Sequence, residues 1–159
     1  MDSFRNIQKS LNHALRQHNM PEHDLESTRQ MVGHGMKRLV ERAAPEKISD
    51  EVVEGILEEL KTHYARNPAD ETVPYDGIPD ILESLTHQKL AVLTNKPHEL
   101  AIEVLKQTKL YHHFDTILGQ RPGNPIKPDS SLLKEFDADE FDRKKIWMIG
   151  DGQADGQFA

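Results

Sequence analysis

Three groups of polar residues in this chain have the chemical types needed to bind a phosphate beside a metal ion. Hydroxyl and amide groups can bond phosphoryl oxygens, and an ammonium group can neutralise their charge. Two carboxylates, with water and phosphate oxygens, are a usual ligand set for Mg2+. The sequence therefore predicts a site for a dianionic phosphate and a divalent metal. The residues that would form it are Thr94 and Asn95, then Lys127, then Asp151 and Asp155.

Apolar runs stand directly before two of these three groups. Residues 90–93 precede Thr94, and residues 145–149 end just before Gly150-Asp151. Short apolar runs without alternation are typical of strands buried on both faces of a parallel sheet. Ligands of such sheets bind at the carboxyl ends of the strands. The two groups are therefore expected to face the same end of one sheet.

The second half of the chain alternates between the two kinds of element. A further strand is expected at 114–118, and helices are expected at 78–85, from Pro97 to about 105, and at 130–135. This alternation predicts an α/β fold built on a doubly wound parallel sheet. The pair Asp137 and Asp139 is interpreted as part of a solvated loop.

The first part of the chain reads as helical only. Apolar residues recur at helical spacing over 4–15, 31–40 and 52–64, with Ser49 or Asp50 as the cap of the third helix. The cluster Asn67-Pro68-Ala69-Asp70 breaks this pattern. A domain boundary is therefore expected near residue 70.

The bulk composition excludes several classes of partner. The chain has 159 residues, no cysteine and a net charge of -7, with an isoelectric point of about 5.7. This acidity argues against nucleic acid or an anionic membrane as the main partner. The sequence has no apolar run long enough to span a membrane, and residues 1–5 lack the apolar stretch of a signal peptide. A cytoplasmic protein is the expectation.

The order of the motifs resembles the haloacid dehalogenase-like phosphohydrolases, most closely the phosphoglycolate phosphatase group. The resemblance implies a Rossmann-like, three-layer α/β/α core, incomplete here, formed by residues 1–3 and 71–159. Residues 4–70 would be the α-helical cap domain. Four stretches carry the resemblance to the family: Val73-Pro74-Tyr75-Asp76-Gly77-Ile78, Leu93-Thr94-Asn95-Lys96-Pro97, Lys127-Pro128-Asp129 and Ile149-Gly150-Asp151-Gly152-Gln153-Ala154-Asp155.

The resemblance also implies roles for the site residues. Thr94 and Lys127 would be catalytic, and together with Asn95 would bind the phosphate. Asp151 and Asp155 would hold Mg2+. The implied reaction is hydrolysis of a small phosphorylated metabolite, such as 2-phosphoglycolate, through an aspartyl-phosphate.

Two residues of the helical segment are candidates for substrate selection. His34, between two glycines, matches a cap loop that reaches over the active site in the resembling group, although a simple helix-start turn would explain it equally well. Arg29 could bind a substrate carboxylate or could be solvated. The remaining histidines do not have the spacing of a zinc site and are interpreted as surface residues.

The family's first motif, an apolar strand followed by Asp-x-Asp-Gly-Thr, has no counterpart in the sequence. Met1-Asp2-Ser3-Phe4 resembles only the tail of that motif, and the chain ends at Ala159, soon after the fourth motif. A fragment or a misplaced start is therefore expected, with an incomplete sheet that favours self-association. Two alternatives stay open: an inactive relative that binds only phosphate, metal or a partner, and a phosphomutase of the same superfamily.

Overall fold

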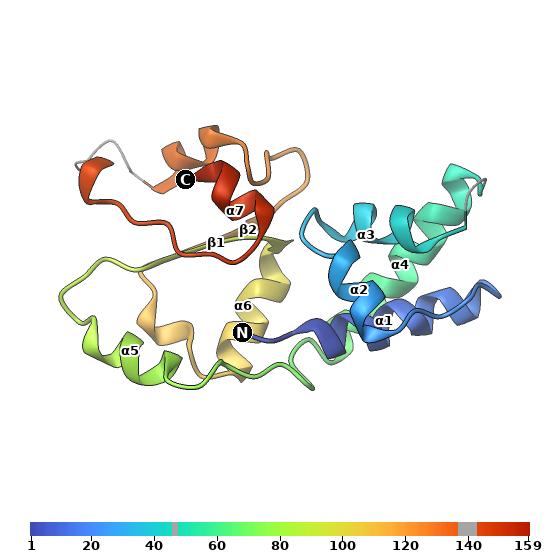
Figure 1. Ribbon diagram of the computed structural model, residues 1–159, viewed down its shortest axis with the longest axis horizontal. Helices are drawn as coiled ribbons and strands as arrows, with labels where there is room; N and C mark the ends of the chain where they lie inside the picture. Colours follow the sequence, from blue (N-terminus) through green and yellow to red (C-terminus); the bar gives the residue numbers. More distant parts are fainter. Residues whose placement is uncertain (46–47, 137–142) are drawn as a thin grey trace.

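The computed structural model describes residues 1–45, 48–136 and 143–159, so the pair Asp137 and Asp139 lies outside the described residues. Figure 1 shows a group of helices on one side and an α/β group on the other. The helical group consists of α1 (Phe4–Gln17), α2 (Leu25–Met31), α3 (Met36–Ala43) and α4 (Asp50–Arg66). The α/β group consists of α5 (Ile78–Ser84), β1 (Ala91–Pro97), α6 (His98–Gln107), η1 (Tyr111–His113), β2 (Thr116–Gln120), η2 (Ser130–Phe136), η4 (Arg143–Lys145) and α7 (Gln153–Phe158).

The helical group is built around α4, which packs against α1 and α3. The apolar stripes of these helices meet in one core, in which Leu15, Val40 and Ile56 are fully buried. Ser49 caps α4 by accepting a hydrogen bond from the Val52 N–H, as its residue type favours. The predicted helices over 4–15 and 52–64 are confirmed.

The single helix expected over residues 31–40 is wrong. Residues 32–35 form a loop between α2 and α3. Gly33 has φ 123° and Gly35 has φ 85°, which are backbone conformations that side chains with a Cβ atom rarely adopt. The two glycines therefore break the apolar pattern into two short helices and release a loop at its centre.

The sheet contains β1 and β2, which pair in parallel with Ala91 opposite Thr116 and Leu93 opposite Leu118. The crossover between the strands carries α6, which packs against both of them. Parallel strands joined through a helix confirm the α/β prediction. Thr94 follows directly after Leu93, the last of the consecutive β1 residues that pair with β2, and so begins the carboxyl-terminal half of β1. The chain leaves β2 toward Lys127 at the same end of the sheet.

The strand expected over 145–149 is wrong, whereas the helical segment expected over 130–135 is present as the 3-10 helix η2. Residues 146–150 have no regular structure, and Trp147 and Ile149 are 86% and 91% exposed. A strand needs a neighbour to satisfy its backbone. Within the described residues the sheet consists of β1 and β2 alone, and this apolar run pairs with neither of them.

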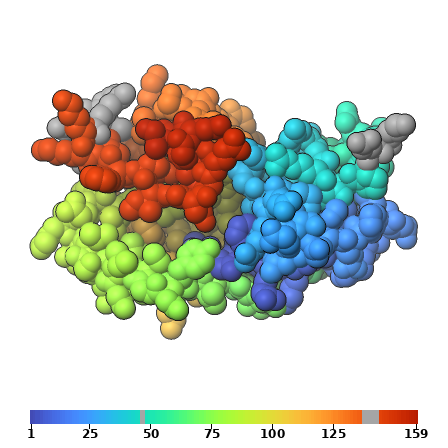
Figure 2. Space-filling view, in the orientation of Figure 1, coloured from blue at the N-terminus to red at the C-terminus, as the bar shows by residue number. Residues whose placement is uncertain are grey.

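The helical group and the α/β group meet along one boundary of the molecule (Figure 2). Beside it, Asp2 and Val73 form an antiparallel bridge, with both backbone N–H groups donating across it at 2.9 and 3.3 Å. This bridge brings the start of the chain next to the segment that leaves α4. None of the helices in the described ranges has the length and apolar character needed to cross a membrane.

Gly119 lets β2 approach the start of α6 closely. A Cβ atom at this position would lie 2.5 Å from the His98 Cα and 2.8 Å from the Lys96 carbonyl oxygen, both of which are backbone atoms. Gly119→Ala is therefore expected to lower the free energy of unfolding by about 1–3 kcal/mol, because the backbone must move. Urea titration would measure it, with Gly156→Ala as the control, since no atom lies within 4 Å of a Cβ there. Equal stabilities would contradict this close approach.

Candidate phosphate and metal site

Asn95 fixes the loop that carries Lys127. Its side-chain Oδ1 accepts a hydrogen bond from the Lys127 backbone N–H at 2.8 Å. Its Nδ2 donates to the Lys127 carbonyl oxygen at 3.1 Å. The amide therefore bonds both backbone groups of one residue across 32 positions in the sequence. This pairing joins the predicted first and second groups at the carboxyl end of β1.

The Lys127 ammonium group joins the second group to the third. Its Nζ donates to the Leu93 carbonyl oxygen at 2.7 Å and to Asp155 Oδ1 at 2.5 Å. The Lys127 and Asp155 side chains are only 11% and 15% exposed. A charge-assisted bond of this kind is strong because solvent screens it little. The structure thus gathers Asn95, Lys127 and Asp155 into one cluster beside Thr94.

Asp155 remains a carboxylate in this cluster. Partial burial alone would raise its pKa, but the Lys127 ammonium group and backbone N–H groups stabilise the ionised form and hold the pKa below its ordinary value. The Gly152 N–H donates to Asp155 Oδ2 at 3.0 Å. A Cβ atom on Gly150 would lie 2.4 Å from Asp155 Cγ, so glycine is required where the loop folds back on this side chain.

Thr94 lies at the same strand end with its hydroxyl oriented by the backbone. Its Oγ1 accepts a hydrogen bond from the Lys96 N–H at 3.1 Å. Because Oγ1 is used there as an acceptor, its own hydrogen is available to donate to a phosphoryl oxygen. The predicted role of Thr94 is consistent with this orientation.

Asp151 is exposed at the start of the same turn. Burial lowers the pKa of the Met1 amino group, while the negative charges of Asp151 and Asp2 oppose that shift, so the amino terminus lies within electrostatic reach of Asp151. The part of the chain described by the structure contains no group of three or more His, Asp or Glu side chains that could hold a metal. Mg2+ is commonly bound by one or two carboxylates plus water and phosphate oxygens, so Asp151 and Asp155 fit that ligand set.

The two residues predicted for substrate selection are placed differently. His34 is half-buried in the loop over residues 32–35. This loop reaches the strand end, because the Gly33 carbonyl oxygen accepts a hydrogen bond from Asn95 Nδ2 at 3.2 Å. Arg29 forms an ion pair with Asp2 at 3.5 Å and lies 5.0 Å from the centre of the Phe4 ring. Arg29 therefore binds the start of the chain, while the His34 loop lies beside the phosphate cluster.

One contact at the site was missed in the sequence. The Lys96 Nζ donates to the Tyr64 hydroxyl oxygen at 2.5 Å and lies 4.4 Å from the centre of its ring. Tyr64 belongs to α4, and in the sequence it is only the last position of the apolar pattern over residues 52–64. The position of Lys96 directly after Thr94-Asn95 indicates that it lies near the site. The direction of its side chain, however, depends on how α4 packs and cannot be predicted from the sequence.

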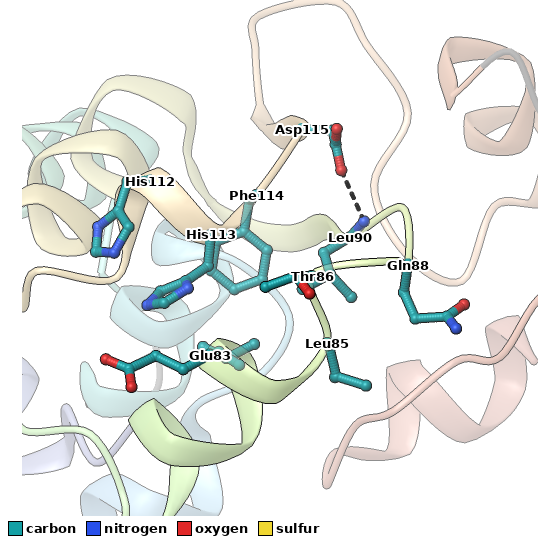
Figure 3. Close-up of a pocket in the computed structure, with 10 residues that line it drawn as sticks. Glu83, Leu85, Thr86, Gln88, Leu90, His112, His113, Phe114 and Asp115 are labelled. Carbon is teal, nitrogen blue, oxygen red and sulfur yellow. Dashed lines mark hydrogen bonds between the residues drawn. The ribbon is translucent and has the colours of Figure 1, made fainter.

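An open pocket of about 440 Å³ lies at the opposite end of the sheet (Figure 3). Leu90 and Asp115, which precede the two strands, form part of its wall, and the Leu90 N–H donates to an Asp115 carboxylate oxygen. His113 and Glu83 line it from η1 and α5. None of the residues predicted for the phosphate site lines this pocket.

The protein is expected to lose stability in acid through Asp155. The pKa of Asp155 is lower in the folded chain than in the unfolded chain. The contribution of Asp155 to the free energy of unfolding is therefore complete above the ordinary aspartate pKa of about 4, and it is lost as the pH falls through the pKa of the folded chain. Urea titrations between pH 7 and pH 3 should show a steeper loss for the native sequence than for Asp155→Asn. Parallel pH profiles for the two proteins would contradict this assignment.

Comparisons with known proteins identify the family of this chain. A family model described as haloacid dehalogenase-like hydrolase matches residues 1–159. The chain is 31% identical over 158 residues to the phosphoglycolate phosphatase of Aquifex aeolicus, covering 98% of this chain and 72% of that protein. It is 29% identical over 161 residues to the phosphoglycolate phosphatase of Caulobacter vibrioides, covering 98% of this chain and 68% of that protein.

Solved structures show the same fold. A protein of Lactobacillus delbrueckii subsp. bulgaricus with a provisional phosphoglycolate phosphatase name superposes with a TM-score of 0.87 at 27% identity, covering 99% of this chain and 76% of that one. A haloacid dehalogenase-like family hydrolase from Streptococcus pneumoniae superposes with a TM-score of 0.83 at 21% identity, covering 97% of this chain and 71% of that one.

A relative from Pseudomonas putida is covered over 64% of its length, so the chain spans roughly two thirds of the curated relatives it matches. The family match nevertheless extends over every residue of the chain, including the three groups of site residues. The chain belongs to the haloacid dehalogenase-like hydrolase family.

Proposed function

We propose that this chain forms the phosphate- and metal-binding part of a Mg2+-dependent phosphomonoester hydrolase. The substrate would be a small phosphorylated metabolite such as 2-phosphoglycolate, the compound named for the relatives in Aquifex aeolicus and Caulobacter vibrioides. Nucleic acid and membranes would not be partners, and the protein would act in the cytoplasm. The acidic composition of the chain supports this choice of partner.

The observation that carries the proposal is the ammonium group of Lys127 at the carboxyl end of β1. It is nearly enclosed, and its bonds to the Leu93 carbonyl oxygen and to Asp155 keep it in one place. A fixed cation beside a threonine hydroxyl suits the oxygens of a phosphoryl group, because phosphoryl transfer is catalysed mainly by positioning and charge compensation.

The residues of the chain would divide the work as follows. Thr94 would donate its hydroxyl hydrogen to one phosphoryl oxygen, and Lys127 would neutralise the charge on the others. Asn95 would hold the Lys127 loop in register with β1. Asp151 and Asp155 would bind Mg2+, which supplies further compensation for the charge of the phosphoryl group.

The helical group would close the site as a cap. Residues 4–70 would form this cap domain, and residues 1–3 with 71–159 would form the core. The hydrogen bond from Asn95 to the Gly33 carbonyl oxygen supports this division, because it places the loop of His34 against the strand end. Closure of a cap excludes water from the reacting phosphate.

A phosphate-release assay with 2-phosphoglycolate tests the proposal. Turnover should require Mg2+ and should fall at least ~100-fold in Asp151→Ala, because the metal loses one of its two carboxylates. Asp80→Ala, which removes an exposed carboxylate on α5, is the control. Turnover that persists in EDTA, or that is equal in both variants, would contradict the metal assignment.

A second candidate is a protein that binds phosphate and metal without turnover. The observation that favours it is the lack of any apolar strand followed by Asp-x-Asp-Gly-Thr among the 159 residues, which leaves the nucleophile of the family unassigned. Mg2+-dependent phosphate binding without phosphate release would support this candidate. Release of phosphate that depends on Asp151 would exclude it.

A further inference from the structure

The Tyr64 hydroxyl group connects the helical group to the phosphate site. Tyr64 is fully buried on α4. Its hydroxyl oxygen accepts a hydrogen bond from Lys96 Nζ at 2.5 Å. Asn6 on α1 donates to the Asn67 carbonyl oxygen and lies near enough to Tyr64 to favour the ionised phenol. The Tyr64 hydroxyl therefore joins α4 to β1, with Asn6 of α1 beside it. A polar group buried at such a junction holds its partners in one arrangement, because breaking any of its bonds leaves a buried group unpaired.

Lys96 is held to Tyr64 in two ways. Besides the hydrogen bond, its ammonium group lies 4.4 Å from the centre of the Tyr64 ring, within the range of a cation–π interaction. None of the ion pairs in the described ranges of the chain includes Lys96. Tyr64 is therefore its main polar anchor, and this anchor belongs to the helical group.

The backbone of Lys96 acts on the phosphate ligand. Its N–H donates to the Thr94 Oγ1 at 3.1 Å, which sets the direction of the threonine hydroxyl. Between them, Asn95 bonds both the Gly33 carbonyl oxygen of the cap loop and the backbone of Lys127. Three consecutive residues thus join α4, the cap loop and the phosphate cluster.

We propose that Lys96 is a positioning residue, which couples the placement of α4 and the cap loop to the direction of the Thr94 hydroxyl at the phosphate site. The coupling rests on the proposed function, since it assigns a role to a site that binds phosphate. It goes beyond that function because the proposed function assigns Lys96 no role in binding phosphate or metal. When α4 is seated, Lys96 and Asn95 hold Thr94 and Lys127 in register. When the contact with Tyr64 is broken, the strand end loses its anchor.

The charge of Lys96 gives this coupling a measurable signature. Burial lowers the pKa of Lys96 to about 8. Burial raises the pKa of Tyr64 to about 12, so the phenol stays neutral while Lys96 titrates. Asn6, which faces the same hydroxyl from α1, carries no charge. Lys127, the cation of the phosphate cluster, is directed to Leu93 and Asp155. Anion affinity that depends on the Lys96 charge should therefore fall as the pH rises through about 8.

Calorimetric titration with tungstate in the presence of Mg2+ tests the proposal, because the charge of this phosphate mimic is constant between pH 7 and 9. Lys96→Met is expected to weaken tungstate binding about tenfold at pH 7, since a displaced ligand loses much of its contribution. Tyr64→Phe should weaken binding by about threefold to tenfold, and the double variant should equal Lys96→Met, because both changes break one link. Lys106→Met is the control, since Lys106 also lies over a tyrosine ring, 5.6 Å from the centre of Tyr111, but on the surface.

A conservative change separates positioning from simple loss of structure. Lys96→Arg keeps the cation beyond pH 9, so binding should recover to within about threefold of the native affinity and lose its decrease near pH 8. Affinities that are equal in the native protein, Lys96→Met and Tyr64→Phe would overturn the coupling. A native pH profile without a decrease near pH 8 would overturn it as well.

The same experiment distinguishes the coupling from the proposed function. If the native protein binds no tungstate, the proposed function fails, and the coupling is then judged by amide hydrogen exchange. Lys96→Met should raise the exchange rates of Asn95 and of residues 33–35 at least fivefold over those in Lys106→Met. Equal rates in the two variants would overturn the coupling.

Discussion

Lys127→Met is expected to weaken the binding of inorganic phosphate about 100-fold or more in the presence of Mg2+. The change removes the cation at the strand end and leaves the Asp155 carboxylate without the partner that lies 2.5 Å from it. The site then presents negative charge to an anion, and truncation of one partner of a buried, hydrogen-bonded charge pair typically costs about 2–5 kcal/mol of binding free energy. Isothermal titration calorimetry with phosphate measures the affinity directly.

Lys134→Met on η2 is the matched control for this change. It removes the same charge from an exposed position close in the sequence to the site, so the net charge of the two variants is equal. The control should keep its phosphate affinity within about twofold, because exposed charges are screened by salt. Equal losses in the two variants would show that only net charge matters and would contradict the role of Lys127.

Leu60→Ala is expected to have the largest effect on stability, with a loss of about 2–5 kcal/mol in the free energy of unfolding. Leu60 is 1% exposed and lies on the face of α4 that packs in the helical core. Removing its branched end leaves a cavity between helices that cannot close completely. Because Tyr64 lies one turn further along α4, the same variant should also weaken phosphate binding.

The neighbouring residue gives a clean control for the core substitution. Glu59→Ala changes an exposed side chain on the same helix, and a surface change of this kind usually alters the free energy of unfolding by less than about 0.5 kcal/mol. Urea unfolding followed by circular dichroism compares the two variants. Similar midpoints for Leu60→Ala and Glu59→Ala would contradict the helical core described here.

The elements with strong periodicity could be predicted from the sequence, and the exceptions have local causes. The apolar stripes of α1 and α4 predict helices directly. The apolar runs that end at Leu93 and at Leu118 predict β1 and β2 in the same way. The helix over 31–40 failed because Gly33 and Gly35 adopt positive φ, which the apolar spacing does not encode. The strand over 145–149 failed because strand formation depends on a neighbouring strand, which a local pattern cannot specify.

The candidate site could be predicted by residue type but not by contact. Hydroxyl and amide groups after one apolar run, an ammonium group in a loop and carboxylates after a second apolar run were sufficient to select the candidate residues, Thr94, Asn95, Lys127, Asp151 and Asp155. The bonds that orient them were not predictable, because they link positions about 30 residues apart through side-chain rotamers that only tertiary packing fixes. The Lys96–Tyr64 contact is the clearest example, since a tyrosine in an apolar stripe gives no indication of where its hydroxyl group points.

Phosphorus NMR of 2-phosphoglycolate mixed with the protein and Mg2+ tests the central claim most directly. The account predicts that the phosphomonoester resonance broadens and shifts in a saturable way, and that Lys127→Met abolishes this change while Lys134→Met preserves it. A new resonance of inorganic phosphate would add turnover to binding. A narrow, unshifted resonance at every protein concentration would contradict the claim that Thr94, Asn95 and Lys127 form a phosphate site.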